Sequence, residues 1–286
     1  MLTIGINSRP KLSVQAFQQL RDFIYSVCGI YIPDSKMYLI ETRLQRRLEE
    51  SGIKTFEDYY YYLMYDKNRE KVISSLINSI VTNETSFFRD PGQLDAFIKG
   101  VVPAAMNEKE KNGSPKTLRL WSAASSTGEE PYTLAMMLVE SGLLYKGWRI
   151  EVLASDICDT VLKSAEAATY EKYSLRNTPE AYLRKYFTNS SERYRVNSSV
   201  KEMVTFRKIN LVDTEAIKTI RGIDVIFCRN VLIYFDDNSK KKVVGHLYDS
   251  LNKGGYLFIG FSETLFNITR VFRPASFERT VVYQKA

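Results

Sequence analysis

The spacing of apolar residues along the chain changes after Thr117. Before that point, apolar residues recur every three or four positions from Ser13 to about Ile80, which predicts a bundle of amphipathic helices. After it, short apolar runs alternate with helical segments, and this alternation predicts a parallel sheet covered by helices. The predicted strands are 118–121, 150–155, 204–208, 224–228 and 256–261, with the alternating tail 277–283 as a late strand.

Polar and turn-forming residues mark the predicted boundaries. The run from Asn107 to Pro115 is charged and rich in turn residues, so we predict a helical domain over 1–90, a linker over 91–117 and an α/β domain over 118–286. The connection over about 169–203 is too long for a simple loop and contains a candidate strand at 193–196. It therefore predicts a subdomain inserted in the α/β domain.

Composition places the chain in a broad class. Its 286 residues, 44% hydrophobic and 26% charged, are typical of a soluble protein of two domains. No stretch approaches a membrane span, and the first ten residues lack a signal-peptide pattern, so we expect a cytoplasmic protein that does not insert into a membrane. The formal charge of +7 suggests an acidic partner, which could be nucleic acid, an anionic membrane surface or a glutamate-rich protein.

Cysteine and histidine usage excludes several kinds of site. Cys28, Cys158 and Cys228 are widely spaced in apolar surroundings, which predicts reduced core thiols and neither disulfides nor a zinc site. His246 is the single histidine and lies in a helical run, away from every loop that we consider a candidate site. Histidine triads and polyhistidine metal sites are therefore excluded, and we expect no metal.

The segment from Leu120 to Tyr132 is the most informative part of the chain. An apolar strand leads into small residues and Gly128, and then Glu129 and Glu130 open a helix. Small side chains allow a ligand to approach the backbone, but a helix N-terminus that binds phosphate would not carry two carboxylates. The pattern disfavours NAD, FAD and ATP and favours a cationic nucleoside ligand such as S-adenosylmethionine. The same carboxylates also suit the dipole of an ordinary helix, an alternative that this segment alone leaves open.

Polar residues follow the other predicted strands, where an open parallel sheet binds its ligands. Asp156 ends the second strand and could accept the hydroxyls of a ribose, and Asn210 and Leu211 after the third could contact adenine. The run from Arg229 through Asn230 to Tyr234 places polar groups near the reacting end. Singly, each has a structural alternative as a helix cap, a turn or a core residue. Together they favour a nucleoside site.

Four ordered motifs closely resemble the CheR-type chemotaxis receptor methyltransferases. They are Thr82–Arg89, Trp121–Tyr132, Asp224–Phe235 and Gly254–Glu263, and the resemblance covers nearly the whole chain. It implies an N-terminal helical domain, a Rossmann-like S-adenosylmethionine domain with an inserted β-subdomain, and esterification of receptor glutamates. The sequence departs from the family pattern at two positions, Phe261, where histidine is frequent, and Cys158. The insertion also lacks the glycine-bracketed loop of members that dock onto a receptor tail peptide.

The resemblance also implies site residues by motif position. Asn83, Thr85 and Arg89 would lie over the cofactor, and Glu129 or Glu130 would hold the methionine amino group. Asp156 would hold the ribose, and the remaining cofactor contacts would come from Asn210, Leu211, Arg229 and Asn230.

Methyl transfer to a carboxylate needs few catalytic groups. A glutamate is already ionised at neutral pH, so no general base is required, and the product is S-adenosylhomocysteine. Arg89 and Tyr234 are our candidate catalytic residues, because arginine offers a fixed fork of donors to a carboxylate and tyrosine a single donor. The structural alternative for Arg89 is an interdomain ion pair.

A basic ridge is predicted on the helix after Ser35. Met37, Ile40, Leu44 and Leu48 fall on one arc of this helix, and Arg43, Arg46 and Arg47 fall on a neighbouring arc with Lys36. Such a ridge suits docking on an acidic surface, here the cytoplasmic helical domains of methyl-accepting chemotaxis receptors. A merely solvated face is the alternative.

Other functions remain open from sequence. A nucleic-acid methyltransferase would fit the net charge, but methylation of base amino groups usually uses a Pro-Pro-aromatic motif after the fourth strand, and the run 229–232 has no proline. We therefore expect no nucleic-acid partner. A carboxyl methyltransferase with another acceptor fits the chemistry but gives the basic ridge no role. A non-catalytic module that senses S-adenosylmethionine could keep every cofactor residue.

Overall fold

The computed structural model describes residues 10–190 and 192–286. The chain forms two compact units, Met1–Thr82 and Asn83–Ala286. The predicted fold class, an all-α part followed by an α/β part with an inserted β-subdomain, is confirmed. The first unit ends before the predicted boundary at residue 90, because Phe87 and Phe88 are buried in the core of the second unit.

The first unit consists of helices that bury one face each. Ser13 caps the first helix, where its hydroxyl accepts from the Ala16 N–H (3.1 Å), and Thr55 caps the third by accepting from the Asp58 N–H (3.1 Å). The predicted apolar arc of the second helix is buried at Ile40, Leu44 and Leu48. The helices are α1 (Val14–Cys28), the 3₁₀ turn η1 (Asp34–Lys36), α2 (Met37–Ser51), α3 (Phe56–Tyr65) and α4 (Arg69–Ile80).

The segment 91–117, predicted to be a linker, is mostly helical and belongs to the second unit. It contains α5 (Pro91–Asp95), the π-helical turn η2 (Ala96–Val101) and α6 (Val102–Lys111). Leu94, Phe97 and Val101 are buried in the core. The charged run from Asn107 suggested a linker because it forms the exposed end of α6, whereas the apolar residues before it determine where the segment packs.

A central sheet of seven strands organises the second unit. Five strands are parallel and follow the order β6-β2-β1-β7-β8, and the antiparallel strands β10 and β9 extend the β8 side. The sheet strands are β1 (Thr117–Ala123), β2 (Arg149–Asp156), β6 (Val204–Lys208), β7 (Ile223–Cys228), β8 (Leu251–Ile259), β9 (Phe272–Phe277) and β10 (Thr280–Lys285). The order reverses between β1 and β7, and such a switch point is where an open α/β sheet binds its ligand.

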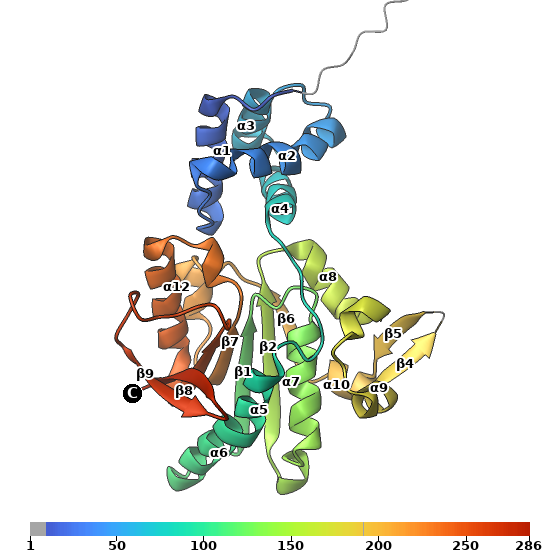
Figure 1. The fold of residues 1–286 in the computed structure, drawn as a ribbon, viewed down its shortest axis with the longest axis vertical. Helices are drawn as coiled ribbons and strands as arrows, with labels where there is room; N and C mark the ends of the chain where they lie inside the picture. The colour runs from blue at the N-terminus through green and yellow to red at the C-terminus, as the bar shows by residue number, and fades with distance from the viewer. Residues whose placement is uncertain (1–9, 191) are drawn as a thin grey trace, which may run out of the picture. The chain divides into compact units, whose positions relative to one another are not determined.

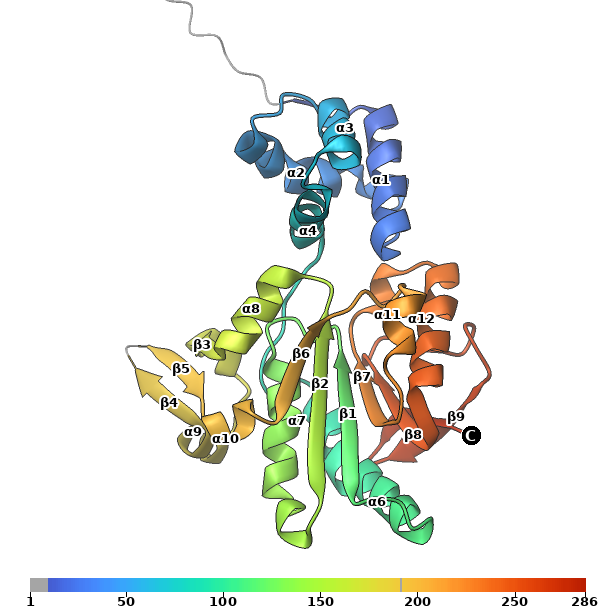
Figure 2. The same ribbon diagram turned by 180° about the vertical axis from the view of Figure 1, so that it is seen from behind.

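Helices cover both faces of this sheet. α7 (Glu129–Glu140) packs against β1 and β2, and α12 (Asp237–Ser250) packs against β8 from the opposite face (Figures 1 and 2). On the neighbouring strands β7 and β8, the rings of Phe227 and Phe258 stack with centroids 4.4 Å apart, and Phe97 of η2 packs edge-on against both. The other helical elements that follow the sheet strands are η3 (Leu144–Lys146), α8 (Asp159–Ala167), α11 (Thr214–Lys218) and the 3₁₀ turn η5 (Leu232–Tyr234).

The C-terminal tail differs from the single late strand that the alternation predicted. Glu278 and Arg279 both have positive φ (43° and 64°) and form a turn, so the tail is the hairpin β9–β10. The predicted alternation holds for β10, where Val282 is buried. The turn carries no glycine or proline, and therefore its sequence gave no signal for the reversal.

The insertion forms its own small sheet. β3 (Thr169–Glu171), β4 (Phe187–Ser190) and β5 (Arg193–Val196) make an antiparallel sheet in the order β3-β5-β4, accompanied by η4 (Lys172–Leu175), α9 (Glu180–Tyr186) and α10 (Ser198–Lys201). Phe87 packs edge-on against Tyr170 and Phe187, with ring centroids 4.8 and 5.0 Å apart. The subdomain is therefore joined to the segment that precedes the sheet. Cys28, Cys158 and Cys228 are buried, and none of these three residues forms a disulfide.

Candidate active site

The loop between β1 and α7 has an unusual backbone. Ala124, Ser126 and Gly128 all have positive φ, 63°, 50° and 92°. A Cβ on Gly128 would lie 2.9 Å from the Cβ of Ala165 and 3.1 Å from the hydroxyl of Tyr170. That hydroxyl donates to the Thr127 carbonyl (2.8 Å). Close packing of the loop against Ala165 and Tyr170 therefore leaves no room for a larger side chain at Gly128, independently of any ligand.

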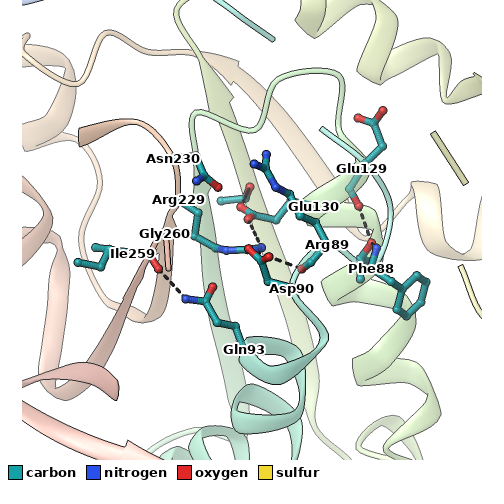
Figure 3. Close-up of polar contacts among 12 residues, drawn as sticks. Phe88, Arg89, Asp90, Gln93, Glu129, Glu130, Arg229, Asn230, Ile259 and Gly260 are labelled. Carbon is teal, nitrogen blue, oxygen red and sulfur yellow. Dashed lines mark hydrogen bonds and ion pairs between the residues drawn. The ribbon is translucent and has the colours of Figure 1, made fainter. Parts of the chain in front are cut away.

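Glu129 and Glu130 lie in different environments although they are adjacent. Glu129 is buried and accepts from the hydroxyls of Thr127 (2.6 Å) and Ser174 (3.1 Å), the latter from the insertion. Burial raises the pKa of the Glu129 carboxyl, and the hydroxyl of Thr127 acts in the opposite direction. Glu130 accepts from the Ser122 hydroxyl (2.7 Å) and pairs with Nη1 of Arg229 (3.0 Å). Figure 3 shows Glu130 facing Arg229, whereas the carboxylate of Glu129 points away from it.

Arg229 is the centre of a buried ionic network. Its side chain is 4% exposed and pairs with Glu130 through Nη1 and with Asp90 through Nη2, and Nη2 also donates to the Arg89 carbonyl (3.2 Å). Gln93 lies beside it and donates to the Ile259 carbonyl (2.7 Å), which links α5 to the end of β8 (Figure 3). The network therefore joins three regions: the 89–90 turn, the start of α7 and the end of β7.

The segment 83–90 lies along the same edge of the sheet. The Asn83 carbonyl accepts from the Ser126 hydroxyl (3.1 Å), and the Phe88 N–H donates to the Thr133 hydroxyl (3.2 Å) on α7. Arg89 is half-buried, and its Nη1 donates to the Glu84 carbonyl (3.0 Å). Thr85 is half-buried within the same segment. Of the predicted residues of this motif, Asn83 thus contacts the β1–α7 loop through its carbonyl, and Arg89 contacts Arg229 through its carbonyl.

Asp156 joins β2 to the same loop. Its Oδ2 accepts from the Ser126 N–H (2.9 Å) and its Oδ1 from the Cys158 N–H (3.0 Å). Burial raises the pKa of the Asp156 carboxyl, while the N–H donors of Cys158 and Ser126 lower it. A carboxylate has about four acceptor positions, so these contacts leave capacity for a hydroxyl of a ligand.

The predicted adenine contacts follow β6. Leu211 is buried, and the Asn210 side chain accepts from the Val212 N–H (3.3 Å). The Leu211 carbonyl lies 2.9 Å from Nδ1 of His246, and Nε2 of this histidine lies 3.2 Å from the Thr214 hydroxyl. A carbonyl only accepts, so we assign the proton to Nδ1. The expectation that His246 lies away from every site loop is therefore wrong, because packing of α12 brings it onto this one.

Asn230 and Tyr234 lie on the turn that follows β7. Asn230 has positive φ (59°), and Tyr234 is half-buried at the end of η5. The predicted docking arginines lie elsewhere, on α2 in the first unit. Arg43 donates to the Ile80 carbonyl and to the Thr82 hydroxyl (2.8 Å), and Arg47 donates to Ser79 (2.6 Å). Only Arg46 extends into solvent, with 83% of its side chain exposed.

Sequence reasoning missed several residues of this cluster. Asp90, Ser122 and Ser174 bind the predicted residues directly, but nothing local distinguishes them. Glu263 was part of a motif yet had no assigned role. Its carboxylate binds both strand-end turns at this edge.

The donor set fits S-adenosylmethionine. Carboxylates of Asp90, Glu129, Glu130 and Asp156 surround the loop, and Arg229 is the one buried guanidinium paired with them in the described chain. A surplus of negative charge suits a sulfonium and an ammonium group and opposes phosphate. Within the described residues, Oγ of Ser125 and Nε of Arg229 are buried without a hydrogen-bond partner. Polar atoms of this kind are available to a bound ligand.

Two kinds of feature are absent from the part of the chain that the structure describes. None of its helices is both long enough and apolar enough to cross a membrane. No group of three or more His, Cys, Asp or Glu side chains within residues 10–190 and 192–286 is arranged to hold a metal ion.

Comparison with known families matches both units. Residues 15–81 match the family described as "CheR methyltransferase, all-alpha domain", and residues 83–281 match "CheR methyltransferase, SAM binding domain". "Chemotaxis protein methyltransferase 2" of Vibrio cholerae serotype O1 is 33% identical over 270 residues, covering 94% of this chain and 92% of that protein. "Chemotaxis protein methyltransferase" of Borreliella burgdorferi is 34% identical over 261 residues, covering 91% of each chain. Among solved structures, a TehB-like SAM-dependent methyltransferase from Corynebacterium glutamicum matches at a TM-score of 0.37 with 11% identity, over 64% of this chain and 88% of that one.

Proposed function

The chain belongs to the CheR methyltransferase family, and on that premise we propose that it transfers the methyl group of S-adenosylmethionine to glutamate side chains of chemotaxis receptors. The products would be glutamyl methyl esters and S-adenosylhomocysteine. The observation that carries this proposal is the surplus of carboxylates around the β1–α7 loop at the switch point of the sheet. It selects a cationic nucleoside and excludes nucleotides that would place phosphate there.

The cofactor contacts follow from the environment of each residue. Glu130 is our choice for the methionine amino group, because its carboxylate faces the ends of β1 and β7, whereas the carboxylate of Glu129 points away from Arg229 and contacts Ser174 of the insertion. Asp156 would accept ribose hydroxyls, and Asn210 and Leu211 would line the adenine end. Asn83, Thr85, Arg89, Arg229 and Asn230 would border the methionine end.

The reaction asks little of the protein beyond orientation. When bound, S-adenosylmethionine supplies a methyl group on a sulfonium, which an ionised carboxylate can attack in line without a base. Arg89 uses Nη1 for the Glu84 carbonyl, and its other N–H donors would hold the acceptor carboxylate. Tyr234 would add a single donor. Proper orientation of the two reactants can be worth about 7 to 11 kcal/mol in favourable cases.

The acceptor would lie on the cytoplasmic helical domains of the receptors, and the chain would then act in the cytoplasm. Contact with an acidic receptor surface would rest mainly on Arg46, because Arg43 and Arg47 are bound to α4. Nothing in this proposal requires a nucleic acid.

A labelled-methyl assay tests the function. The protein is incubated with methyl-labelled S-adenosylmethionine and a receptor cytoplasmic fragment, then treated with alkali, which releases methanol from glutamyl methyl esters. We expect released methanol with the wild type and little with Arg89→Ala, and we expect Arg89→Lys to recover only part of the activity. Label that resists alkali would mean another acceptor chemistry. Cofactor binding without any transfer to the fragment would instead indicate a sensing module.

A further inference from the structure

Glu263 binds the backbone of two separate turns with one carboxylate. Its Oε2 accepts from the N–H groups of Gly260 (2.5 Å) and Asn230 (3.0 Å), and its Oε1 accepts from the N–H of Ile233 (3.2 Å). Gly260 follows β8, whereas Asn230 and Ile233 follow β7. One side chain therefore holds together the turns at the ends of two adjacent parallel strands. Hydrogen bonds to a charged acceptor are stronger than those between neutral groups.

The surrounding backbone is adapted to this carboxylate. A Cβ on Gly260 would lie 2.7 Å from Oε2 of Glu263 and 2.9 Å from the N atom of Asn230. Asn230 has the left-handed conformation (φ 59°), which needs support from its surroundings. The Glu263 N–H in turn donates to the Gly260 carbonyl (2.9 Å). The close approach of Gly260, the positive φ of Asn230 and the hydrogen bonds to Glu263 therefore all occur at the same point of the structure.

The turn that Glu263 holds is the one that carries Tyr234. The Tyr234 N–H donates to the Val231 carbonyl (3.1 Å), so the phenol is placed by the 230–234 turn and not by a long element. Both oxygens of Glu263 are occupied by backbone N–H groups, which leaves it no role as a base for a carboxylate that is already ionised. A fixed anion that orders a turn bearing a substrate donor is a positioning group.

We propose that Glu263 is a positioning residue for methyl transfer, which acts by fixing the 230–234 turn and thereby the hydroxyl of Tyr234 relative to the acceptor carboxylate. This inference rests on the function proposed above. The inference gives Glu263 of the fourth motif a physical role, which the residue pattern and the spacing of the motif did not indicate.

Two variants displace the carboxylate in different ways. Glu263→Gln keeps one carbonyl oxygen but sets an NH₂ group against a backbone N–H, and Gly260→Ala keeps the charge but forces Oε2 away. We expect either change to lower kcat for receptor methylation by about 10- to 100-fold, since misplacing a reacting group by about 1 Å can cost about 100-fold. Gly260→Ala provides the test if Glu263→Gln does not fold.

A double-mutant cycle with Tyr234→Phe separates positioning from a general structural role. If Glu263 acts through Tyr234, the double variant will be no slower than the slower single variant. The matched control is Asp224→Asn, at another buried carboxylate on β7, which accepts from the Arg119 N–H (2.9 Å) and from Asn252 (2.7 Å) and pairs with Lys109 (2.9 Å). We expect it to lower thermal stability, leave kcat of the folded protein within about twofold, and combine multiplicatively with Tyr234→Phe.

The outcomes are distinguishable. The proposal is supported if the losses of kcat do not multiply when Glu263→Gln is combined with Tyr234→Phe but do multiply when Asp224→Asn is combined with Tyr234→Phe. Two results overturn the proposal while the methylation function stands, provided that the wild type is active. One is that the loss of kcat in Glu263→Gln or Gly260→Ala multiplies with the loss in Tyr234→Phe, and the other is that either variant leaves kcat within about twofold of the wild type. A wild type that yields no alkali-labile ester on the receptor fragment overturns the proposed function and the role of Glu263 with it.

Discussion

Arg46 and Arg229 are both paired with a glutamate, but in opposite environments. Arg46 on α2 contacts Glu50 at 2.8 Å with 83% of its side chain exposed, whereas Arg229 after β7 contacts Glu130 at 3.0 Å with 4% exposed. An exposed pair typically contributes about 0 to 1 kcal/mol to stability. A buried charge is tolerated only where partners compensate it, and Arg229 has Glu130, Asp90 and the Arg89 carbonyl.

The difference shows which charges are parts of the architecture. Around Arg229, ionic contacts join segments that lie far apart in sequence, from the 89–90 turn to the end of β7. Around Arg46, the contact is with a residue one turn along the same helix. Charges of the first kind shape a site, and a charge of the second kind is available to a partner. The predictions below test this distinction in order of decreasing effect.

Removing the buried guanidinium should have the largest effect. We expect Arg229→Met to lower the free energy of unfolding by about 3 to 5 kcal/mol, because Glu130 and Asp90 lose their compensating charge. Chemical denaturation measures this, with Arg46→Met as the matched control, for which we expect a change of about 0 to 1 kcal/mol. Equal stability of the two variants would contradict the comparison.

Removing the buried acceptor at the end of β2 should be next. We expect Asp156→Ala to weaken S-adenosylhomocysteine binding by roughly 10- to 100-fold, since hydrogen bonds to a charged group contribute about 1.5 to 3 kcal/mol. Calorimetric titration measures the affinity. The control is Asp159→Ala, whose carboxylate is exposed and paired with Lys208 (2.5 Å). Unchanged affinity in the Asp156 variant would remove it from the ribose site.

The buried Glu129 should make stability depend on pH. Burial raises the pKa of this carboxyl in the folded chain, so the folded state takes up the proton at a higher pH than the unfolded state, where glutamate titrates near about 4.3. Between the two pKa values the free energy of unfolding falls as pH rises. We therefore expect the wild type to gain stability relative to Glu129→Gln as pH is lowered through this window. Denaturation at several pH values checks this, and a constant difference would refute it.

Reversing the exposed arginine should have the smallest effect on the protein itself. We expect Arg46→Glu to lower stability by about 1 kcal/mol or less and to leave cofactor affinity unchanged, but to slow methylation of a receptor fragment at low salt, an effect that fades where the Debye length falls to about 10 Å. Arg43 is the contrasting position, because Arg43→Glu would also break the contact with the Ile80 carbonyl. Equal methylation rates for wild type and Arg46→Glu at low salt would show that α2 is only a solvated face.

Local pattern was sufficient for the fold class, and it also indicated the edge of the sheet where we place the candidate site. Periodicity alone separated the helical part from the alternating α/β part, because burial of one face of a helix or strand imposes a repeat on the sequence. The small residues before Glu129 and the polar residues after each strand indicated one edge of the sheet for the candidate site, because parallel strands end on one side of their sheet. These features depend on neighbours in sequence.

The tertiary structure decided how individual charges and polar groups are used. Adjacent glutamates received different partners, Ser174 for Glu129 and Arg229 for Glu130, and His246 came to rest on the Leu211 carbonyl. Segment 91–117 became part of the core, and Glu263 joined two turns. Each outcome depends on a contact between residues remote in sequence. The sequence alone indicated the strand ends at which polar groups gather, and only packing determined which groups meet there, because side-chain partners are set by geometry in three dimensions.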